Sequence, residues 1–333
     1  LLFEGWRLLV KRGIDQKNNT NGRIIARLES ETYSFRNFIH GINLAETKTW
    51  ERQALIGILW SSLARYYFFM TSGSWVVWHT EIHLWQLEQL PIRFPDNAEL
   101  HNRITVIVDK LRNWDTKPLD LLTHQSQPNQ AETVESLERQ LDEAIFDLYE
   151  LNEAERDLVL DMCETGLEFF YRHSNSNAVK SLELCPQSEQ GFITDLPQQR
   201  DTEKGLEGYL YAFLAMWQDY LEPDGIFRWQ IIRPNNNPMV AVVFTTQPKY
   251  DGLPSPLNDE AAWSDLKQII ESNRQELSSR IYIDGLVRLV TDDEIIIIKR
   301  NERRLWTRSQ AREDAEATIL QAMHIQEINR SNA

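Results

Sequence analysis

Two histidines four residues apart, His79 and His83, stand in a tryptophan-rich stretch, TSGSWVVWHTEIHLWQLEQLPIRFP, that runs from Thr71 to Pro95. On a helix such residues share one face, which is the spacing of two metal ligands in zinc proteases. In that motif the glutamate directly follows the first histidine, whereas Glu81 lies midway between the two. A catalytic zinc site also needs a third protein ligand, and the next histidine, His101, follows two prolines. The stretch therefore favours an aromatic recognition surface over a metal centre.

Motifs for other chemistry are missing or incomplete. No two prolines are adjacent, so the Pro-Pro-aromatic loop of amino-group DNA methyltransferases is missing, and no Gly-x-Gly provides a nucleotide-binding turn. Neither a P-loop nor a Gly-x-Ser-x-Gly elbow occurs. A metal-dependent nuclease remains an alternative, because Asp224 and Lys249 flank an expected hairpin. Against it, Gln247 stands where such sites have an acid, and Pro248 disfavours strand pairing.

The charge of the chain is acidic but uneven. Its 333 residues carry a formal charge of −15, which argues against indiscriminate coating of nucleic acid. Residues 1–95 contain 11 Lys and Arg against 8 Asp and Glu, a balance of +3, so the remainder carries −18. The two cysteines, Cys163 and Cys185, form neither a disulfide framework nor a metal-binding pattern. With no visible signal peptide or membrane-spanning apolar run, these features favour a cytoplasmic location.

The pattern of polar and apolar residues predicts an α+β fold with two domains. Small β-sheets flanked by helices are expected in a recognition domain at residues 1–115. A polar linker at 116–135 and an acidic helical connector at 136–180 follow, and then a second α+β domain with two hairpins and helices at 200–330. The main predicted elements are helices at 51–69, 203–221, 261–277 and from Ser309, and hairpins formed by 226–234 with 239–247 and by 281–290 with 294–300.

A set of stretches in the first half carries a family resemblance: RLLVKRGI, GRIIARLE, FRNFIHGINL, ALIGILWSSLARYYFFMTSGSW and LEQLPIRFP. Together they resemble the C-terminal target-recognition region of adenine-specific DNA methyltransferases of the single-chain restriction-modification, type IIG-like group. LDEAIFDLYELNEAERDLV is similar to the helical segment that follows it, and IIIIKRNERRLWTRSQAREDAEATI to a tail in some relatives. The resemblance implies a catalytic, S-adenosylmethionine-binding domain upstream of Leu1. No cofactor and no methyl transfer are expected for this chain alone.

The resemblance further implies that the chain recognises a sequence in double-stranded DNA, with the upstream methyltransferase domain and DNA as partners and no membrane. Arg side chains can bind guanine in bidentate fashion, Asn can bind adenine, and cations and hydroxyls contact phosphate. Trp85 is expected in the core, whereas Trp75 is open to either role. The candidate DNA-binding residues are Arg7, Lys11, Arg12, Arg23, Arg27, Arg36, Asn37, His40, Ser72, Ser74, Trp75 and His79.

A second candidate cluster lies in KRNERRLWTRSQAR, residues 299–312, where six cations accompany one acid, Glu302. Cations at the start of the following helix oppose its dipole, so helix stability alone does not explain them. We predict a second phosphate contact there, with Trp306 anchored in the core. The alternative is an exposed hairpin end whose charges keep an edge strand soluble. The residues predicted to bind phosphate are Arg303, Arg304 and Arg308.

A competing function of another class is a protein-interaction scaffold of a DNA-modification complex. The acidic helices at 132–172 would then dock a partner subunit, and DNA contact would be incidental. The two functions differ in where binding energy lies. Partner binding that survives deletion of residues 1–95, without DNA binding by the intact chain, would favour the scaffold.

Limited proteolysis is expected to cut first within residues 116–135, because this polar stretch offers little apolar surface to bury. Fragment masses would locate the cut. A chain cleaved only near its ends would contradict the predicted boundary.

Overall fold

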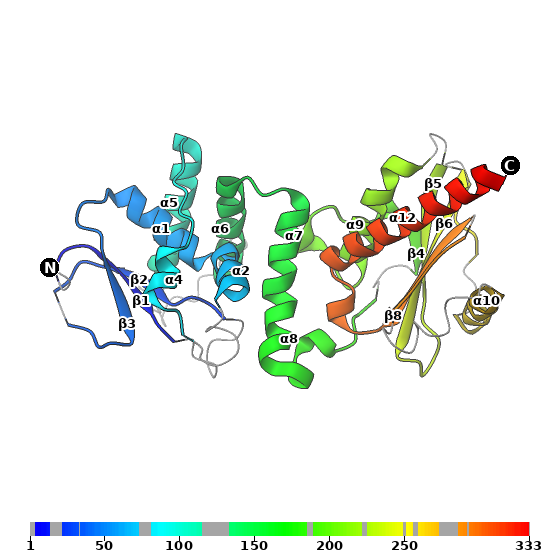
Figure 1. The fold of residues 1–333 in the computed structure, drawn as a ribbon, viewed down its shortest axis with the longest axis horizontal. Coiled ribbons are helices and arrows are strands. Elements are labelled where there is room, and N and C mark those ends of the chain that lie inside the picture. The colour runs from blue at the N-terminus through cyan, green and yellow to red at the C-terminus, as the bar shows by residue number, and fades with distance from the viewer. Residues whose placement is uncertain are drawn as a thin grey trace, which may run out of the picture. The chain divides into compact units, whose positions relative to one another are not determined.

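The structure, a computed structural model, combines helices with two antiparallel sheets, which confirms the predicted α+β fold (Figure 1). It divides into two compact units, unit 1 (Leu1–Tyr171) and unit 2 (Arg172–Ala333). Within the part of the chain that is described, no helix is long and apolar enough to cross a membrane. The described residues are 4–13, 22–32, 34–72, 81–114, 133–184, 189–221, 225–248, 251–255, 259–272, 286–291 and 293–332.

Unit 1 joins a three-stranded antiparallel sheet, in the order β2-β1-β3, to a set of helices. The strands are β1 (Arg7–Lys11), β2 (Ala26–Glu29) and β3 (Ile39–Asn43). A π-helical turn, Met162–Gly166, connects the last two helices. The helices are α1 (Thr49–Trp60), α2 (Ser62–Thr71), α4 (Leu84–Glu88), α5 (Ala98–Arg112), α6 (Val134–Tyr149), α7 (Glu153–Asp161) and α8 (Leu167–Arg172).

The central strand β1 is covered on both faces for most of its length. Leu8 and Val10 point into the hydrophobic core on one face, because alternate side chains of a strand share a face. On the other face, a side chain at Gly41 would come within 2.4 Å of the ring of Phe35, so the glycine leaves room for that ring. Lys11, the last residue of β1, is exposed. The C-terminal end of β1 is therefore the open end of the strand.

Helices α1, α5 and α6 pack tightly in the core of unit 1. A side chain at Gly57 of α1 would lie 3.2 Å from Val108 of α5 and 3.4 Å from Leu141 of α6. Leu141 and Ile145 of α6 are buried in the same core. Unit 1 consequently extends beyond residue 115. The acidic helices expected as a separate connector at 136–180 belong to it as far as Tyr171, because the apolar stripe of α6 completes its core.

A buried aspartate separates α1 from α2, so the single helix predicted at 51–69 is wrong. Ser61 ends α1 with an extended backbone, ψ 157°. Asp142 of α6 accepts hydrogen bonds from the backbone N–H (2.6 Å) and the hydroxyl (2.7 Å) of Ser62. The carboxylate thus satisfies two donors at the start of α2, where the helix dipole also favours negative charge.

Unit 2 is built on a five-stranded antiparallel sheet in the order β4-β5-β6-β8-β7. Both predicted hairpins are present, and they join through β6 and β8, where Val242 lies opposite Ile297. The strands are β4 (Gln190–Phe192), β5 (Gly225–Ile232), β6 (Met239–Pro248), β7 (Leu286–Val290) and β8 (Glu294–Arg300). The main helices are α9 (Glu207–Trp217), α10 (Asp259–Ser272) and α12 (Arg308–Asn332).

Helices cover both faces of this sheet (Figure 1). On one face, α9 and α12 pack against the strands, and the ring of Phe213 stacks on Phe244 with centroids 4.1 Å apart. On the other face, Leu266 of α10 shares a cluster with Val243 and Ile296. Two buried faces explain why β6 and β8 are apolar over most of their length instead of alternating.

A buried ion-pair network fastens α9 and α12 to the sheet. Asp314 of α12 is fully buried and pairs with Lys299 of β8 and with Nη2 of Arg288 in β7, 2.7 Å from its Oδ1. It also accepts a hydrogen bond from the hydroxyl of Tyr209 in α9 (2.5 Å). Burial lowers the pKa of Lys299, while Asp314 opposes that shift. Four elements therefore meet at one carboxylate.

Replacing Asp314 by Ala is expected to lower the free energy of unfolding by about 3–5 kcal/mol, because Lys299 would remain buried without its counter-ion. Urea unfolding followed by tryptophan fluorescence measures the change. The adjacent Glu313, which is exposed and also pairs with Arg288, is the matched control; Glu313→Ala should cost no more than about 1 kcal/mol. If the two substitutions lower the free energy of unfolding equally, the buried ion-pair network does not stabilise unit 2 as described.

Asp142 is expected to make unit 1 less stable as pH rises from about 4 to 6. Burial raises the pKa of Asp142 from 3.8 to about 6, although hydrogen bonds from Ser62 oppose that shift. The folded state then binds more protons than the unfolded state between these values, so stability present below pH 4 is lost as pH rises through 6. A difference of about two units corresponds to about 3 kcal/mol.

The Asp142→Asn variant should lack this pH dependence, because its amide does not titrate. Urea unfolding of both proteins at pH 4, 5, 6 and 7 tests the expectation. Glu143→Gln, a neutralisation at an exposed position of the same helix, serves as the control and should keep the wild-type profile. If the free energy of unfolding varies with pH in the same way for Asp142→Asn and the wild type, Asp142 is not the source of the pH dependence.

Candidate nucleic-acid interface

Three segments of unit 1 meet at the C-terminal end of β1. The N–H of Arg12 donates to the carbonyl of Phe38 (2.8 Å), and the N–H of Ile82 donates to the carbonyl of Arg12 (2.7 Å). Gly13 forms a β-bridge with Glu81. The chain before β3 and residues 81–82 of the tryptophan-rich stretch therefore both contact this end of β1. The β1-end surface is defined by Lys11, Arg12, Arg36, Asn37, Phe38, His40 and Glu81.

Arg12 and His40 are held by hydrogen bonds at this surface. The guanidinium of Arg12 donates to Oε2 of Glu81 (2.9 Å) and to the carbonyl of Asn37 (3.4 Å), and its side chain is 28% exposed. Nε2 of His40 lies 2.8 Å from the carbonyl of Ile82, so it carries the proton of that hydrogen bond. Both side chains therefore contact residues 81–82 beside β1.

The rest of the β1-end surface is open to solvent. Lys11, Arg36 and Asn37 are exposed, and neither cation makes an ion pair with another described residue. Phe38 is 63% exposed. Two uncompensated cations, one amide and one exposed ring therefore lie together. Cations suit phosphate, and the amide and the ring suit base edges and stacked bases.

Phe38 and Glu81 were not among the predicted residues of this surface. A large aromatic residue directly after Arg36 and Asn37, in a turn, is a local signal that could have identified Phe38. Glu81 has no local signal, because its partner Arg12 is distant in the sequence and only the fold brings the two together.

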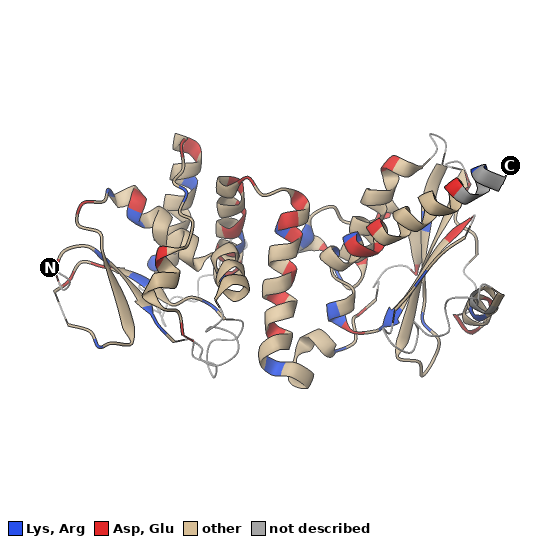
Figure 2. Ribbon diagram, in the orientation of Figure 1, with Lys and Arg blue, Asp and Glu red and all other residues tan. Residues whose placement is uncertain are grey.

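Two further candidates, Arg23 and Arg27, are exposed but compensated by carboxylates. Arg23 pairs with Glu138 of α6, and Arg27 pairs with Glu29, 2.9 Å away. Backbone donation from Glu31 is the main cause of the lowered pKa of Glu29, with the charge of Arg27 adding to it. Figure 2 shows Lys and Arg on the strands of unit 1 and Asp and Glu concentrated on α6 and α7.

Three candidates are buried, and their prediction as DNA contacts is corrected. Arg7 is 0% exposed, since it lies at the start of the central strand and donates to the carbonyl of Glu31. Ser72 is buried at the C-terminus of α2, where its N–H donates to Phe68. Arg308 is 3% exposed and pairs with Glu203 (2.9 Å). None of the three presents its side chain to a phosphate.

Only part of the tryptophan-rich stretch belongs to the described residues. Ser74, Trp75 and His79 lie outside the described residues, so their predicted roles stay predictions. Trp85 was expected in the core, and this is wrong: it is 54% exposed and stacks on His83, with centroids 6.5 Å apart. In the helix α4 the tryptophan occupies the outward face, while Leu87 occupies the buried one.

The cation cluster at 299–312 is smaller than its sequence suggests. Three of its cations form ion pairs: Lys299 with Asp314, Arg308 with Glu203, and Arg304 with Glu302 (2.8 Å). Arg303 is exposed. Trp306 is buried, as predicted, and its indole N–H donates to the carbonyl of Arg300 (2.8 Å).

The alternative explanation for this cluster, protection of an edge strand, does not apply to β8 itself, although its hairpin partner β7 lies at the edge of the described sheet. β8, which ends at Arg300, lies between β6 and β7 and has no free edge. Arg300 is exposed and lies 3.8 Å from the carboxylate of Glu302, and Arg303 is exposed beside it. A phosphate contact there stays a prediction.

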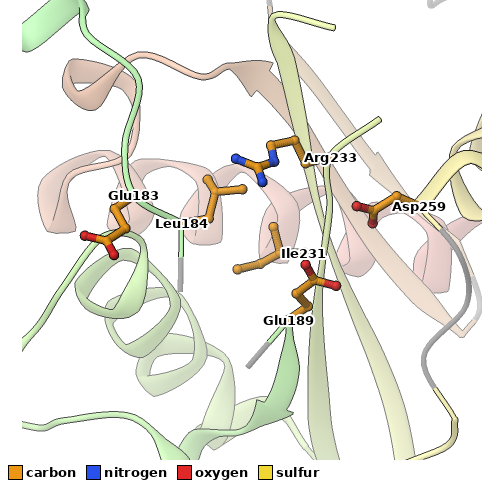
Figure 3. Close-up of a pocket in the computed structure, with 6 residues that line it drawn as sticks. All are labelled: Glu183, Leu184, Glu189, Ile231, Arg233 and Asp259. Carbon is orange, nitrogen blue, oxygen red and sulfur yellow. The ribbon is translucent and has the colours of Figure 1, made fainter. Parts of the chain in front are cut away.

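Unit 2 also contains a pocket of about 180 Å³. Figure 3 shows Ile231 of β5 at its centre, with side chains from separate segments around it. Carboxylates outnumber the single guanidinium, so the pocket disfavours a phosphate ligand. No predicted site residue lies in it. The lining residues are Glu183, Leu184, Glu189, Ile231, Arg233 and Asp259.

Among the described residues, no group of three or more His, Cys, Asp or Glu side chains is arranged to hold a metal ion. Asp224 and Lys249, on which the nuclease alternative rests, lie outside these residues, although Gly225 and Pro248 beside them pair in the hairpin. Comparison of the chain with protein-family models, curated proteins and solved structures finds no match. The resemblance to adenine-specific methyltransferases therefore stays a prediction.

Proposed function

We propose that unit 1 binds double-stranded DNA through the β1-end surface and recognises its sequence for a site-specific adenine DNA methyltransferase. The observation that carries the proposal is the meeting of Lys11 and Arg36, which have no acidic partner among the described residues, with the oriented Arg12 and the exposed Asn37. Methyl transfer and S-adenosylmethionine binding would belong to an upstream domain of the same polypeptide. The sequence resemblance supplies the adenine-specific part of the proposal.

The charge distribution supports specific over indiscriminate binding. With a net charge of −15, most of the protein repels the DNA backbone. Attraction is then limited to the few places where cations lack acidic partners, of which the β1-end surface is one. Such a protein would approach DNA in one orientation, which is what sequence recognition requires.

The scaffold alternative has less support. Its docking element would be the acidic helices at 132–172, yet Leu137, Leu141 and Ile145 of α6 are buried within unit 1. The apolar stripe of α6 is therefore not available to a partner subunit. On α6 and α7, Leu158 is the large apolar side chain that is exposed and could contact a partner.

Removing Lys11 and Arg36 is expected to flatten the salt dependence of DNA binding. Each lost phosphate contact should reduce the slope of log K against log salt by roughly 0.9. Fluorescence anisotropy with a labelled duplex pool, titrated at several salt concentrations, measures the slope for Lys11→Ala, Arg36→Ala and the double variant. Binding to all sequences should weaken alike.

Arg103→Ala is the matched control, since Arg103 is an exposed cation of unit 1 that pairs with Asp147 on the helices. It removes the same charge away from the β1-end surface and should leave the slope unchanged. Identical slopes for the control and the double variant would refute the proposed surface. Absence of duplex binding by the wild-type chain would refute the function itself.

A further inference from the structure

Arg12 differs from the other cations of the β1-end surface in being held on two sides. Glu81 accepts from Nη2 at 2.9 Å, and the carbonyl of Asn37 accepts from Nη1 at 3.4 Å. These acceptors belong to two segments that the fold brings to the end of β1. The guanidinium plane is therefore oriented before any ligand arrives, whereas Lys11 and Arg36 extend into solvent without such partners in the described chain.

The carboxylate beside Arg12 makes it a poor phosphate contact. A phosphate approaching the guanidinium also meets the charge of Glu81, so the pair attracts the DNA backbone far less than a lone cation does. A fixed guanidinium nevertheless suits base recognition, since its planar array of donors is already ordered and loses less freedom on binding.

The geometry leaves donors for a base edge. Nη1 and Nη2 each carry two N–H groups, and each is engaged once among the described residues. Two parallel N–H groups match the O6 and N7 acceptors of guanine in the major groove. Nε of Arg12 is buried without a hydrogen-bond partner among the described residues, so Nη1 and Nη2 would supply the donors to a base. The side chain as a whole is 28% exposed.

We propose that Arg12 recognises a guanine and that Glu81 is its positioning residue. This rests on the proposed function of DNA recognition. Lys11 and Arg36 then contact phosphates and position the protein on the DNA, whereas Arg12 determines the sequence that is bound.

An ion pair that merely fastens the chain at Glu81 to β1 is the competing explanation. The backbone already provides that attachment through the hydrogen bond from Ile82 to Arg12 and the bridge between Gly13 and Glu81. His40 adds a hydrogen bond to Ile82. With side chains that are 28% and 36% exposed, this ion pair adds to an attachment that the backbone already makes, so its orienting effect on Arg12 is the better account.

The test is selection of duplexes from a randomised pool by the purified full chain, followed by sequencing. Arg12→Lys keeps the charge but loses the planar donors, so preference for guanine at one position should fall about tenfold or more, with the salt slope unchanged. Glu81→Gln should reduce preference at the same position while raising affinity for all duplexes, because a negative charge is removed. A fastening role alone would change thermal stability and leave base preference intact.

Arg93→Lys and Glu150→Gln are matched controls, since these residues form an exposed ion pair elsewhere in unit 1. Neither should alter base preference. If the wild-type chain selects a sequence and Arg12→Lys retains every preference, the role of Arg12 is overturned and the proposed function stands. If the wild-type chain binds no duplex, the proposed function is overturned, and the role of Arg12 with it.

Discussion

The carboxylate of Asp314 is the point on which the architecture of unit 2 depends. It lies in α12, yet its partners come from α9, β7 and β8. A buried lysine needs an anion close by, and a buried aspartate needs donors on both oxygens, so these groups can be buried only together. This mutual requirement fixes α12 across the sheet. It also removes the charge of Lys299 from the surface and thereby changes what the segment after β8 can bind.

Unit 1 contains a smaller version of the same arrangement. Asp142 of α6 binds the start of α2, and the sulfhydryl of Cys163 donates to the carbonyl of Ser62 in the same place (3.4 Å). A helix expected to belong to a connector is thereby tied to the rest of unit 1. Burial of this carboxylate raises its pKa, so the attachment of α6 to α2 is sensitive to pH in a way that a surface ion pair is not.

Local patterns in the sequence predicted much of the fold. The alternation of polar and apolar runs located both hairpins of unit 2. Asn152 with Glu155 three residues later forms a capping box at the start of α7, a pattern that is local in the sequence. The pairing of β6 with β8 was not predictable, because it joins two hairpins across a long stretch of chain and leaves no periodic signal. The end of α1 at Ser61 was missed for a similar reason, since Asp142 lies far along the sequence.

At the candidate site, too, the sequence did not show which charged residues would be paired. Composition identified the cations of the first strands, but not which of them would be compensated. Arg7 is buried and donates to the carbonyl of Glu31, Arg308 pairs with Glu203, and Arg12 pairs with Glu81. Each of these partners lies far along the sequence and is brought near only by the tertiary structure. Neighbouring positions such as Lys11 and Arg12 therefore have different electrostatic environments although they adjoin in the sequence.

The charges that remain uncompensated bear on how DNA recognition would work. Nonspecific affinity grows with the number of phosphates neutralised, and the β1-end surface offers few unpaired cations within a protein of net charge −15. If unit 1 recognises DNA, its contribution is therefore discrimination among sequences more than strength of binding.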